Sequence, residues 1–391
     1  MVTDNRLNSI EVIVVGQHLL NTLGQIRTLG ESGIHPTVIW MEYNSSHNPQ
    51  KCKYIGNYYS VRDSLEAFDL IVSKRNFDNK AIISSDSDSF ISLLDKHYSL
   101  LKDYYFFFNA GKDERLSAFL SKVEQCTLAE SVGFNVPKTE QVNVGELPRR
   151  VSYPIFTKSI DSFDPYWKKD TSICMDENDL LDFYKSCSSS SVLLQSFIEK
   201  DNEIALEGVS LDSGNTVIIP VQGEYLRCPK DGFGSYKKLE SYSLGEEILV
   251  RVKKMLQHIG YSGIFEIEFM RDKSGKLFFL EINFRHTQYN HALTDMGANL
   301  MMDWIRSITM RRFAPTQILK SPLIVINEIK DFRTYVLTKQ ISLFKWLKDF
   351  VTSDSYYLWD QKDYFFVFAY FLRALKTRLT LFPSFFGLGR R

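Results

Sequence analysis

Several sequence features that would assign a function directly are missing from this chain of 391 residues. Its five cysteines form no CxxC pair, so neither a disulfide framework nor a cysteine-based zinc site is expected. Lysine plus arginine and aspartate plus glutamate both number 47, a balance that argues against nucleic acid as a partner. No G-x-S-x-G motif or Cys/His signature indicates nucleophilic catalysis. The function must be sought in another kind of site.

Long apolar runs are missing as well. The start, MVTDNRLNSIEVIVVG, has no basic stretch followed by a long apolar core, so no secretory signal is expected. The nearest approach to a membrane-spanning helix, Tyr364–Leu372, is ended by Arg373 well short of the roughly 18 residues required. With 44% hydrophobic and 24% charged residues, the composition is that of an ordinary folded protein, and we expect a reducing, cytoplasmic location.

Residues 1–110 are predicted to form a small parallel α/β domain. Gly16, Gly24 and Gly30 do not form GxGxxG at the first strand–helix turn, so a Rossmann dinucleotide site is not expected. Apolar, β-branched segments alternate with helical or polar stretches, as in a buried parallel sheet. The predicted strands are Ile10–Gly16, Gly33–Trp40, Tyr54–Val61, Ala81–Ser85 and Tyr104–Phe108.

Residues 111–315 mix helices with strands. Helices are predicted at Asp113–Val132, Glu177–Cys187 and Leu244–Ile259, and strands at Ile155–Lys158 and Val192–Phe197. The most informative segment is GIFEIEFMRDKSGKLFFLEINFR. Its two strands, Ile264–Arg271 and Leu277–Asn283, flank the turn DKSG and predict an antiparallel hairpin.

Acidic residues lie inside the apolar strands of this hairpin. Side chains repeat every two residues, so Glu266 and Glu268 share one face, as do Glu281 and Asn283 on the second strand. Pairing can bring Glu268 opposite Glu281 and Asn283, where magnesium would relieve the repulsion between carboxylates. Arg285 projects to the same side and could bind a phosphate. The alternative is an amphipathic hairpin with acids facing water, which the apolar neighbours and the N-x-R ending disfavour.

LEINFR resembles the metal-binding strand of the ATP-grasp superfamily, written E-[IVM]-N-x-R in many members. The resemblance implies an α/β fold in which a small N-terminal domain precedes a two-lobed ATP-grasp domain. It implies ATP and magnesium as cofactors, with two ions and manganese as a substitute. By position, Glu268 would be the first magnesium ligand, Glu281 would bridge both ions, and Asn283 would complete the second. Arg285 would contact phosphate or the activated carboxylate.

Two lysines extend the resemblance. SKVEQCTLAESVGFNVPKT is similar to the opening signature of the superfamily and implies that Lys122 binds nucleotide phosphate. YPIFTKS is similar to the next strand and implies the same role for Lys158; the alternative for each lysine is a solvated charge. Many members then carry a glycine-rich loop over the phosphates, whereas this chain has SIDSFDPYWKKD. Either Lys168 and Lys169 do part of that work, or the loop is a different lid.

VLLQSFIEKDNE resembles the hinge between the two lobes, near residues 195–203. Backbone groups of Ser196, Phe197 and Ile198 would read the adenine edge. Glu203 occupies the position of the carboxylate that binds the ribose hydroxyls. Gln195 stands where many members have an acidic residue, and its amide can still accept from the adenine amino group.

The stretch GEYLRCPKDGFGSYKK is similar to segments of D-aspartate ligase-like carboxylate–amine ligases, which makes Arg227 a candidate for binding substrate or phosphate. An exposed basic hairpin is the alternative for this stretch. The resemblance implies an ATP-dependent ligase that activates a carboxylate as an acyl phosphate and joins it to an amine. The two substrates would be small molecules, an amino acid or a cell-envelope precursor among them. The segment after Arg285 could line the acceptor pocket, with His286 and His291 as polar lining rather than metal ligands.

Two other functions stay open. One is a carboxylase-like or carbamoyl-phosphate-synthase-like module that phosphorylates bicarbonate; the other is a non-catalytic nucleotide-binding protein. Residues 316–391 are an aromatic and basic extension, with five basic residues and no acidic one from Tyr364 onward. Its final helix either packs on the grasp domain or docks on an anionic membrane. A homodimer is also considered.

Overall fold

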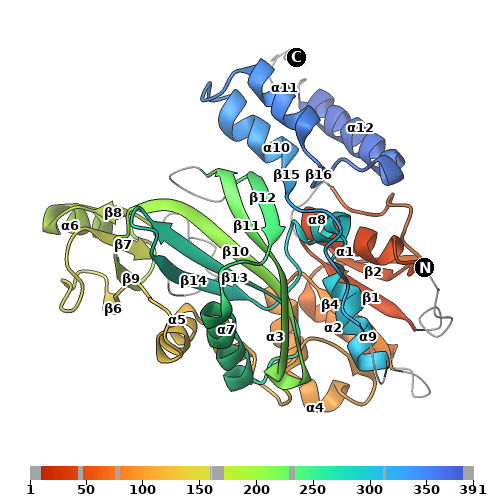
Figure 1. The fold of residues 1–391 in the computed structure, drawn as a ribbon, viewed down its shortest axis with the longest axis horizontal. Helices are drawn as coiled ribbons and strands as arrows, with labels where there is room; N and C mark the ends of the chain where they lie inside the picture. Colours follow the sequence, from red (N-terminus) through yellow and green to blue (C-terminus); the bar gives the residue numbers. More distant parts are fainter. Residues whose placement is uncertain are drawn as a thin grey trace, which may run out of the picture. The chain divides into compact units, whose positions relative to one another are not determined.

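The computed structural model describes residues 10–42, 47–74, 80–158, 160, 171–228, 234–310 and 314–381, with side chains up to residue 373. The chain divides into two compact units, each described by itself (Figure 1). Unit 1 comprises Met1–Phe90, Asp103–Phe107 and His286–Arg391, and unit 2 comprises Ile91–Lys102 and Phe108–Arg285. The loop SIDSFDPYWKKD lies almost entirely outside the described residues, as does part of the stretch after Arg227. The predicted domain bounds stay predictions.

Unit 1 contains a five-stranded sheet in the order β3-β2-β1-β4-β5, and all of its pairings are parallel. Every residue of the three central strands is buried, which is why their sequences are almost continuously apolar. This confirms the predicted parallel α/β arrangement. The strands are β1 (Val12–Gly16), β2 (Thr37–Met41), β3 (Asn57–Val61), β4 (Ala81–Ser85) and β5 (Tyr105–Phe106).

The turn from β1 into α1 (Leu19–Gly30) is held by Asp86, which directly follows β4. Its carboxylate accepts hydrogen bonds from the Gln17 amide at 2.9 Å, the His18 amide at 3.1 Å and the Thr22 hydroxyl at 2.8 Å. Burial raises the pKa of Asp86, although these donors favour its charged form. The carboxyl ends of two neighbouring strands are thereby fixed to each other.

The other helices of unit 1 come from both ends of its sequence. α2 (Ser64–Ser73) begins at Asp63, whose carboxylate caps the amides of Leu65 and Glu66. α3 (Asp88–Lys96) continues into unit 2. The later elements of unit 1 are α8 (Asn290–Met296), α9 (Leu300–Thr309), β15 (Leu323–Ile326), α10 (Glu328–Asp331), η4 (Phe332–Val336), α11 (Leu343–Thr352), β16 (Ser355–Tyr356), η5 (Gln361–Asp363) and α12 (Tyr364–Leu381).

The final helix does not follow the expectation that it packs on the grasp domain. Phe366 lies under the Arg27 guanidinium, 5.8 Å from the ring centroid, and Tyr370 packs against the ring of His47 at 4.5 Å. Within the described residues, these contacts of α12 are with the N-terminal part of unit 1. Sequence pattern alone could show the apolar face of this helix but not the surface that covers it.

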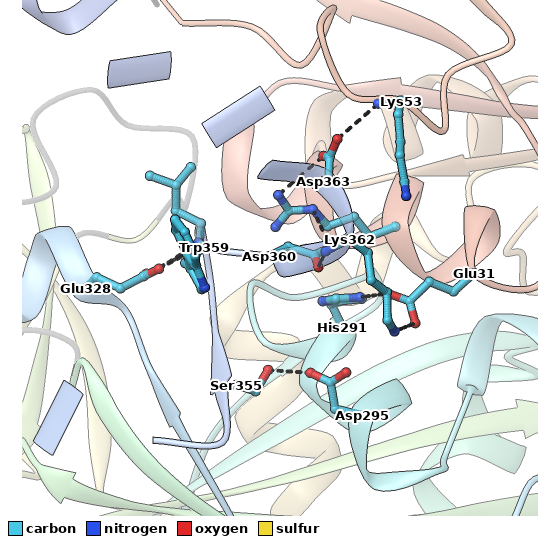
Figure 2. Close-up of polar contacts among 12 residues, drawn as sticks. Glu31, Lys53, His291, Asp295, Glu328, Ser355, Trp359, Asp360, Lys362 and Asp363 are labelled. Carbon is cyan, nitrogen blue, oxygen red and sulfur yellow. Dashed lines mark hydrogen bonds and ion pairs between the residues drawn. The ribbon is translucent and has the colours of Figure 1, made fainter. Parts of the chain in front are cut away.

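Arg27 of α1 anchors the start of α12 through Asp360 and Asp363, the two carboxylates labelled in Figure 2. Its guanidinium lies 3.4 Å from a carboxylate oxygen of Asp360 and 3.4 Å from one of Asp363, and it is almost fully buried. The second oxygen of Asp363 accepts a hydrogen bond from the Lys53 amide at 3.1 Å. A buried cation thus joins the N-terminal helix to the C-terminal segment.

A second ion-pair group lies beside it (Figure 2). The Glu31 carboxylate lies 3.0 Å from Nε2 of His291 and 2.7 Å from the Lys362 ammonium. Ligating atoms of Glu31, His291 and Asp360 lie within 4.8 Å of one another, as in some metal sites. Here Lys362 and Arg27 already supply positive charge to the carboxylates, so an ion-pair network explains the cluster.

Unit 2 contains two antiparallel sheets. In the larger one, five strands follow the order β14-β13-β10-β11-β12; the smaller has the order β6-β9-β7-β8. The larger sheet consists of β10 (Lys200–Leu211), β11 (Thr216–Arg227), β12 (Tyr236–Ser241), β13 (Gly263–Asp272) and β14 (Leu277–Asn283). The smaller consists of β6 (Thr139–Asn143), β7 (Ile155–Lys158), β8 (Ile173–Cys174) and β9 (Ser191–Ser196). The predicted hairpin is β13 and β14.

The helices of unit 2 cover its sheets. α6 (Glu177–Ser186) packs on the smaller sheet through Leu180 and Phe183, and α7 (Glu246–Ile259) buries an apolar stripe. The helix predicted at Asp113–Val132 is wrong in extent. A short 3-10 helix, η2 (Ser117–Leu120), is separated from α5 (Lys122–Ser131) by Ser121, whose ψ of 127° interrupts the helix.

Replacing Glu31 by glutamine should make the stability of unit 1 less dependent on pH. Burial alone would raise the pKa of Glu31, but His291 and Lys362 outweigh it and lower the pKa from 4.5 to about 2. The charge therefore stabilises the fold fully above about pH 4.5, and this stabilisation is lost as the pH falls toward 2. We expect Glu31→Gln to reduce the free energy of unfolding by up to about 3 kcal/mol at pH 7.

Urea unfolding at pH 7 and at pH 3 measures this effect, and the difference between the two proteins should shrink by about half or more at pH 3. The exposed residue Glu11 offers a control, because Glu11→Gln should change little at either pH. A loss of stability for Glu31→Gln that is the same at both pH values would contradict the ion-pair explanation.

Candidate active site

The register of β13 and β14 brings acidic side chains together on one face of the larger sheet. Glu268 pairs with Glu281, and Glu266 pairs with Asn283. The Asn283 amide donates to Glu266 Oε2 at 3.0 Å and lies 3.5 Å from Glu281 Oε1. Directly opposite residues of antiparallel strands share a face, so four oxygen-donor side chains converge here.

The neighbouring strand β10 adds a further acid to this face. Glu207 pairs with Glu266, and both side chains are buried, with exposures of 1% and 3%. Ala205 pairs with Glu268, and its small side chain leaves space in front of that carboxylate. Glu203 follows two residues earlier on the same face. We call Glu207, Glu266, Glu268, Glu281 and Asn283 the carboxylate cluster.

A buried lysine, Lys237 of β12, belongs to the same face and was missed by the sequence prediction. It pairs with Tyr225 of β11, and its ammonium lies 4.5 Å from the centroid of that ring. A side chain at Gly223 would come within 2.9 Å of the Lys237 Cδ, so glycine leaves the path along which Lys237 crosses the sheet. The segment SYKKLES contains a sequence signal for this buried lysine. Neighbouring residues of a strand face opposite ways, so one of the two adjacent lysines must face the inner side, and Lys238 is the more exposed one.

Electrostatics link Lys237 to the carboxylate cluster. Burial lowers the pKa of Lys237, while Glu266, Glu268 and Glu207 oppose the shift. Burial raises the pKa of Glu268 well above its usual value, with Glu266 and Glu281 adding repulsion and Lys237 reducing it. Glu268 stays partly accessible to solvent, so its neighbours as well as desolvation shape its charge.

The carboxylate cluster suits a magnesium ion. Among the described residues of this sheet face, several carboxylates and one amide oxygen donor outnumber the buried lysine Lys237, so negative charge exceeds positive charge there. Carboxylate and amide oxygens are the protein ligands that Mg²⁺ takes, usually together with substrate phosphates. Burial is the largest cause of the raised pKa of Glu268, and the charges of Glu266 and Glu281 raise it further, so added positive charge would relieve repulsion within the cluster.

The two predicted phosphate lysines lie near Glu281. Lys122 is the first residue of α5, and Lys158 is the last residue of β7. Their shared neighbour is the Cys126 thiol: burial raises its pKa, Lys158 and Lys122 lower it, and Glu281 raises it. The charges of Lys122, Lys158 and Glu281 thus all act on one thiol, which agrees with the predicted position of the two lysines near Glu281.

Gln125 fixes α5 to the strand that carries Glu281 and Asn283. Its amide nitrogen donates to the Ile282 carbonyl at 3.0 Å and to the Phe119 carbonyl at 2.8 Å. Its carbonyl oxygen accepts from the Ile282 amide at 3.1 Å. The buried side chain thus replaces a missing strand partner at Ile282 and sets the position of Lys122 relative to β14.

The predicted hinge connects β9 to β10. The Ser196 amide donates to the Lys138 carbonyl at 2.8 Å, and the Phe197 amide donates to the Pro154 carbonyl at 3.0 Å. Two of the three hinge amides are therefore occupied by the smaller sheet, which leaves Ile198 as the candidate donor to adenine. The Gln195 amide donates to the Thr139 hydroxyl at 2.9 Å.

Glu203, the predicted ribose ligand, forms an ion pair with Lys200 at 2.9 Å. Burial lowers and the Glu203 charge raises the pKa of Lys200, which on balance rises. Lys200 also lies 3.5 Å from the Cys228 sulfur. A ribose at Glu203 would have to share its carboxylate with this ammonium.

The two predicted arginines stand at strand ends. Arg227 closes β11, and its guanidinium lies 4.0 Å from the centroid of the Tyr236 ring. The segment that follows, residues 229–233, is outside the described part of the chain. Arg285 comes two residues after Asn283, beyond the end of β14, and is partly exposed.

Sequence comparison supports the assignment of the fold. Residues 117–306 match the family model described as carbamoyl-phosphate synthase L chain, ATP binding domain. A biotin carboxylase from Nostoc sp. is 28% identical over 136 residues, which covers 33% of this chain and 30% of that enzyme. The matched stretch thus spans less than a third of the length of this relative.

Structure comparison extends the similarity to most of the chain. The N5-carboxyaminoimidazole synthetase from Staphylococcus aureus has a TM-score of 0.62 at 16% identity, covering 85% of this chain and 87% of that one. The L-amino acid ligase from Bacillus licheniformis has a TM-score of 0.57 at 15% identity, with 76% and 74% covered. The biotin carboxylase domain of Hydrogenobacter thermophilus 2-oxoglutarate carboxylase has a TM-score of 0.59 at 19% identity, with 78% and 71% covered. Identities this low show the fold alone.

Residues 117–306 therefore resemble in sequence the ATP-binding domain that this family model describes, and the hairpin β13–β14 lies within the matched residues. The fold of the chain is similar to that of the solved N5-carboxyaminoimidazole synthetase over 85% of its length.

Removing the buried cation should disturb the carboxylate cluster strongly. We expect Lys237→Met to lower the free energy of unfolding by about 3 kcal/mol, because loss of one partner leaves buried charges uncompensated. The destabilisation should be smaller at pH 5 than at pH 8, since the cluster can then protonate. Chemical denaturation at both pH values measures this.

The adjacent residue provides the matched control. Lys238 pairs with Glu240 on the exposed side of β12, so Lys238→Met should change stability by no more than about 0.5 kcal/mol. Equal effects of the two substitutions would show that Lys237 does not compensate the cluster.

Breaking the Gln125 contact should loosen α5. Gln125→Leu keeps most of the volume but removes three hydrogen bonds and leaves the backbone of Ile282 unpaired, so we expect a loss of about 2–3 kcal/mol in stability. Binding of Mg²⁺–ADP, measured by calorimetry, should weaken at least about tenfold as Lys122 loses its position. Gln141→Leu, at an exposed site of β6, should do neither. Unchanged nucleotide affinity in Gln125→Leu would refute the positioning role.

Proposed function

We propose that this protein is an ATP- and magnesium-dependent ligase that activates a carboxylate as an acyl phosphate and joins it to an amine. The observation that supports this most strongly is the carboxylate cluster on the sheet face of an ATP-grasp domain, with Lys122 and Lys158 beside it. A protein that only bound nucleotide would have no need to hold so many mutually repelling acids together. ATP-grasp ligases and carboxylases among its relatives agree with this class.

The proposal assigns a role to each predicted site residue. Glu268, Glu281 and Asn283 would hold magnesium, as two ions or with manganese in its place; when bound, the metal would neutralise charge on the nucleotide phosphates. Lys122 and Lys158 would bind these phosphates from two separate elements.

The hinge and the arginines complete the assignment. Ile198 would donate to the adenine edge, with Gln195 accepting from the adenine amino group and Glu203 binding the ribose. Arg285 and Arg227 would bind the transferred phosphoryl group or the substrate carboxylate, because a guanidinium binds such anions in a bidentate manner.

The reaction needs no nucleophilic side chain. A carboxylate oxygen attacks the γ-phosphorus of ATP and ADP leaves. The amine nitrogen then attacks the carbonyl carbon of the acyl phosphate, phosphate leaves, and the nitrogen loses a proton. Positioning and electrostatic stabilisation supply the rate enhancement in such transfers. We infer D-aspartate ligase-like chemistry on an amino acid or cell-envelope precursor, in a cytoplasmic protein that could form a homodimer.

Phosphorylation of bicarbonate is the second candidate. It is favoured by the match to the carbamoyl-phosphate synthase domain and to a biotin carboxylase. The solved carboxylase domain from Hydrogenobacter thermophilus was crystallised with MgADP and bicarbonate. Both candidates use the same nucleotide site, and they differ in the acceptor of the phosphoryl group.

Phosphate release with paired amino acids and envelope precursors, followed by mass spectrometry of the product, tests the proposal. Glu281→Gln should reduce ATP consumption at least about 100-fold, since loss of a metal ligand removes several kcal/mol of transition-state stabilisation. Glu240→Gln, at a partly exposed site of β12, should leave the rate unchanged.

Three outcomes are distinct. Phosphate release that requires both a carboxylate and an amine supports the ligase. Release that requires bicarbonate instead supports the second candidate. Turnover that is the same in Glu281→Gln and the unaltered protein across the whole panel sinks both.

A further inference from the structure

The helix α12 leaves a continuous apolar stripe exposed. Tyr364, Phe365, Phe368, Phe371 and Leu372 are between 43% and 68% exposed. Their spacing of one, three, four and seven residues places them on one side of the helix. We call these five residues the α12 stripe. Large apolar side chains seldom gather on the surface of a protein unless that surface binds something.

The opposite side of α12 is packed, so this exposure does not come from a detached helix. Phe366 and Val367 are each 2% exposed, and Tyr370 packs on the ring of His47. The guanidinium of Arg373 donates to the Asn48 side chain at 3.0 Å. With its start held by Asp363, the helix packs on unit 1 through one face and exposes the other.

The helix α11 repeats this pattern. Leu343, Phe344, Leu347 and Val351, the α11 stripe, are between 44% and 86% exposed at helical spacing. The other side of α11 is packed: Trp346 lies 5.1 Å from the ring of Phe332 in an edge-on contact. Two helices of the same C-terminal segment thus each have one apolar face that contacts the rest of unit 1 and one that is exposed, although the contacting face of α11 is only partly buried.

Charge distinguishes between the occupants that could cover these stripes. The chain as a whole is neutral, yet the sequence from Tyr364 onward carries five basic residues and no acidic one. Lys345 and Lys348 flank the α11 stripe. A symmetric dimer through these faces would set like charges against each other, at a cost. An anionic lipid surface accepts both the apolar side chains and the basic residues.

Aromatic and aliphatic side chains with basic neighbours are typical of helices that lie in the membrane interface. No helix within the described residues is long and apolar enough to cross a bilayer. An interfacial position needs only one apolar face per helix, which is what α11 and α12 have.

We propose that the α11 and α12 stripes dock this protein on a membrane surface that contains anionic lipid. This inference does not depend on the proposed ligase activity, because it rests on unit 1 and not on the carboxylate cluster of unit 2. The protein would bind reversibly, with the apolar side chains entering the headgroup boundary and the basic residues near lipid phosphates.

Flotation of the full chain with vesicles tests this. Vesicles of phosphatidylcholine with phosphatidylglycerol should bind the protein, and vesicles of phosphatidylcholine alone should bind it poorly. Phe365→Ser with Phe368→Ser should weaken partitioning at least about tenfold. Lys345→Gln with Lys348→Gln should weaken it roughly 20-fold on anionic vesicles and remove part of its dependence on salt.

Leu65→Ser with Met175→Ser, which alters two exposed apolar residues outside both stripes, should have no effect on partitioning. Sedimentation of each variant without lipid shows whether it stays folded and in which oligomeric state. Equal binding to both kinds of vesicle overturns the assignment of an anionic surface. Failure of the full chain to bind either vesicle overturns the proposal, and a dimer that the stripe substitutions dissociate would show that a second copy covers the stripes instead.

Discussion

The arrangement of unit 2 depends on a group of acidic side chains that share one sheet face with the buried ammonium of Lys237. The acids are Glu203, Glu207, Glu266, Glu268 and Glu281. Glu207 and Glu266 are buried side by side, and Lys237 reaches toward them from two strands away. That reach requires a glycine at position 223, where any side chain would collide with the lysine. The path of Lys237 across this face therefore constrains the size of residue 223 on the intervening strand β11. Burial and the charges of Glu266 and Glu281 raise the pKa of Glu268. The carboxylates that Lys237 does not neutralise would bind the magnesium ion of a magnesium–nucleotide complex.

The sequence allowed the local part of this site to be predicted. Hairpin strands and alternation place Glu268 beside Glu281 because they are joined by a short turn. Glu207 and Lys237 come from strands whose pairing is set by distant contacts, so periodicity alone could not bring them to the same place. In the same way, the N-terminal strands were predicted because buried parallel strands are continuously apolar, whereas the break of the helix at Ser121 has no strong sequence signal.

The comparisons with known proteins likewise bear on nucleotide binding and do not identify the substrate. The match to an ATP-binding domain and the structural similarity to carboxylases and to an amino acid ligase concern the shared fold and its nucleotide half. On the proposed substrate side, the segment that follows Arg227 and Cys228 is outside the described part of the chain. Resemblance in the nucleotide half is therefore compatible with both bicarbonate and amino acids, and only product analysis separates them.

The proposed membrane contact and the proposed chemistry use different parts of the chain, so each can fail without the other. The α12 stripe is exposed because the helix has a second apolar face, which packs against residues around Arg27 and His47. Substituting Phe365 and Phe368 spares Phe366 and Tyr370 on the packed face, and it leaves Lys237 and the carboxylate cluster unaltered. A variant that loses lipid binding but keeps ATP turnover would therefore show that the C-terminal extension holds the protein at the membrane and takes no part in catalysis. A variant that lost both would instead indicate that the lipid surface holds the substrate.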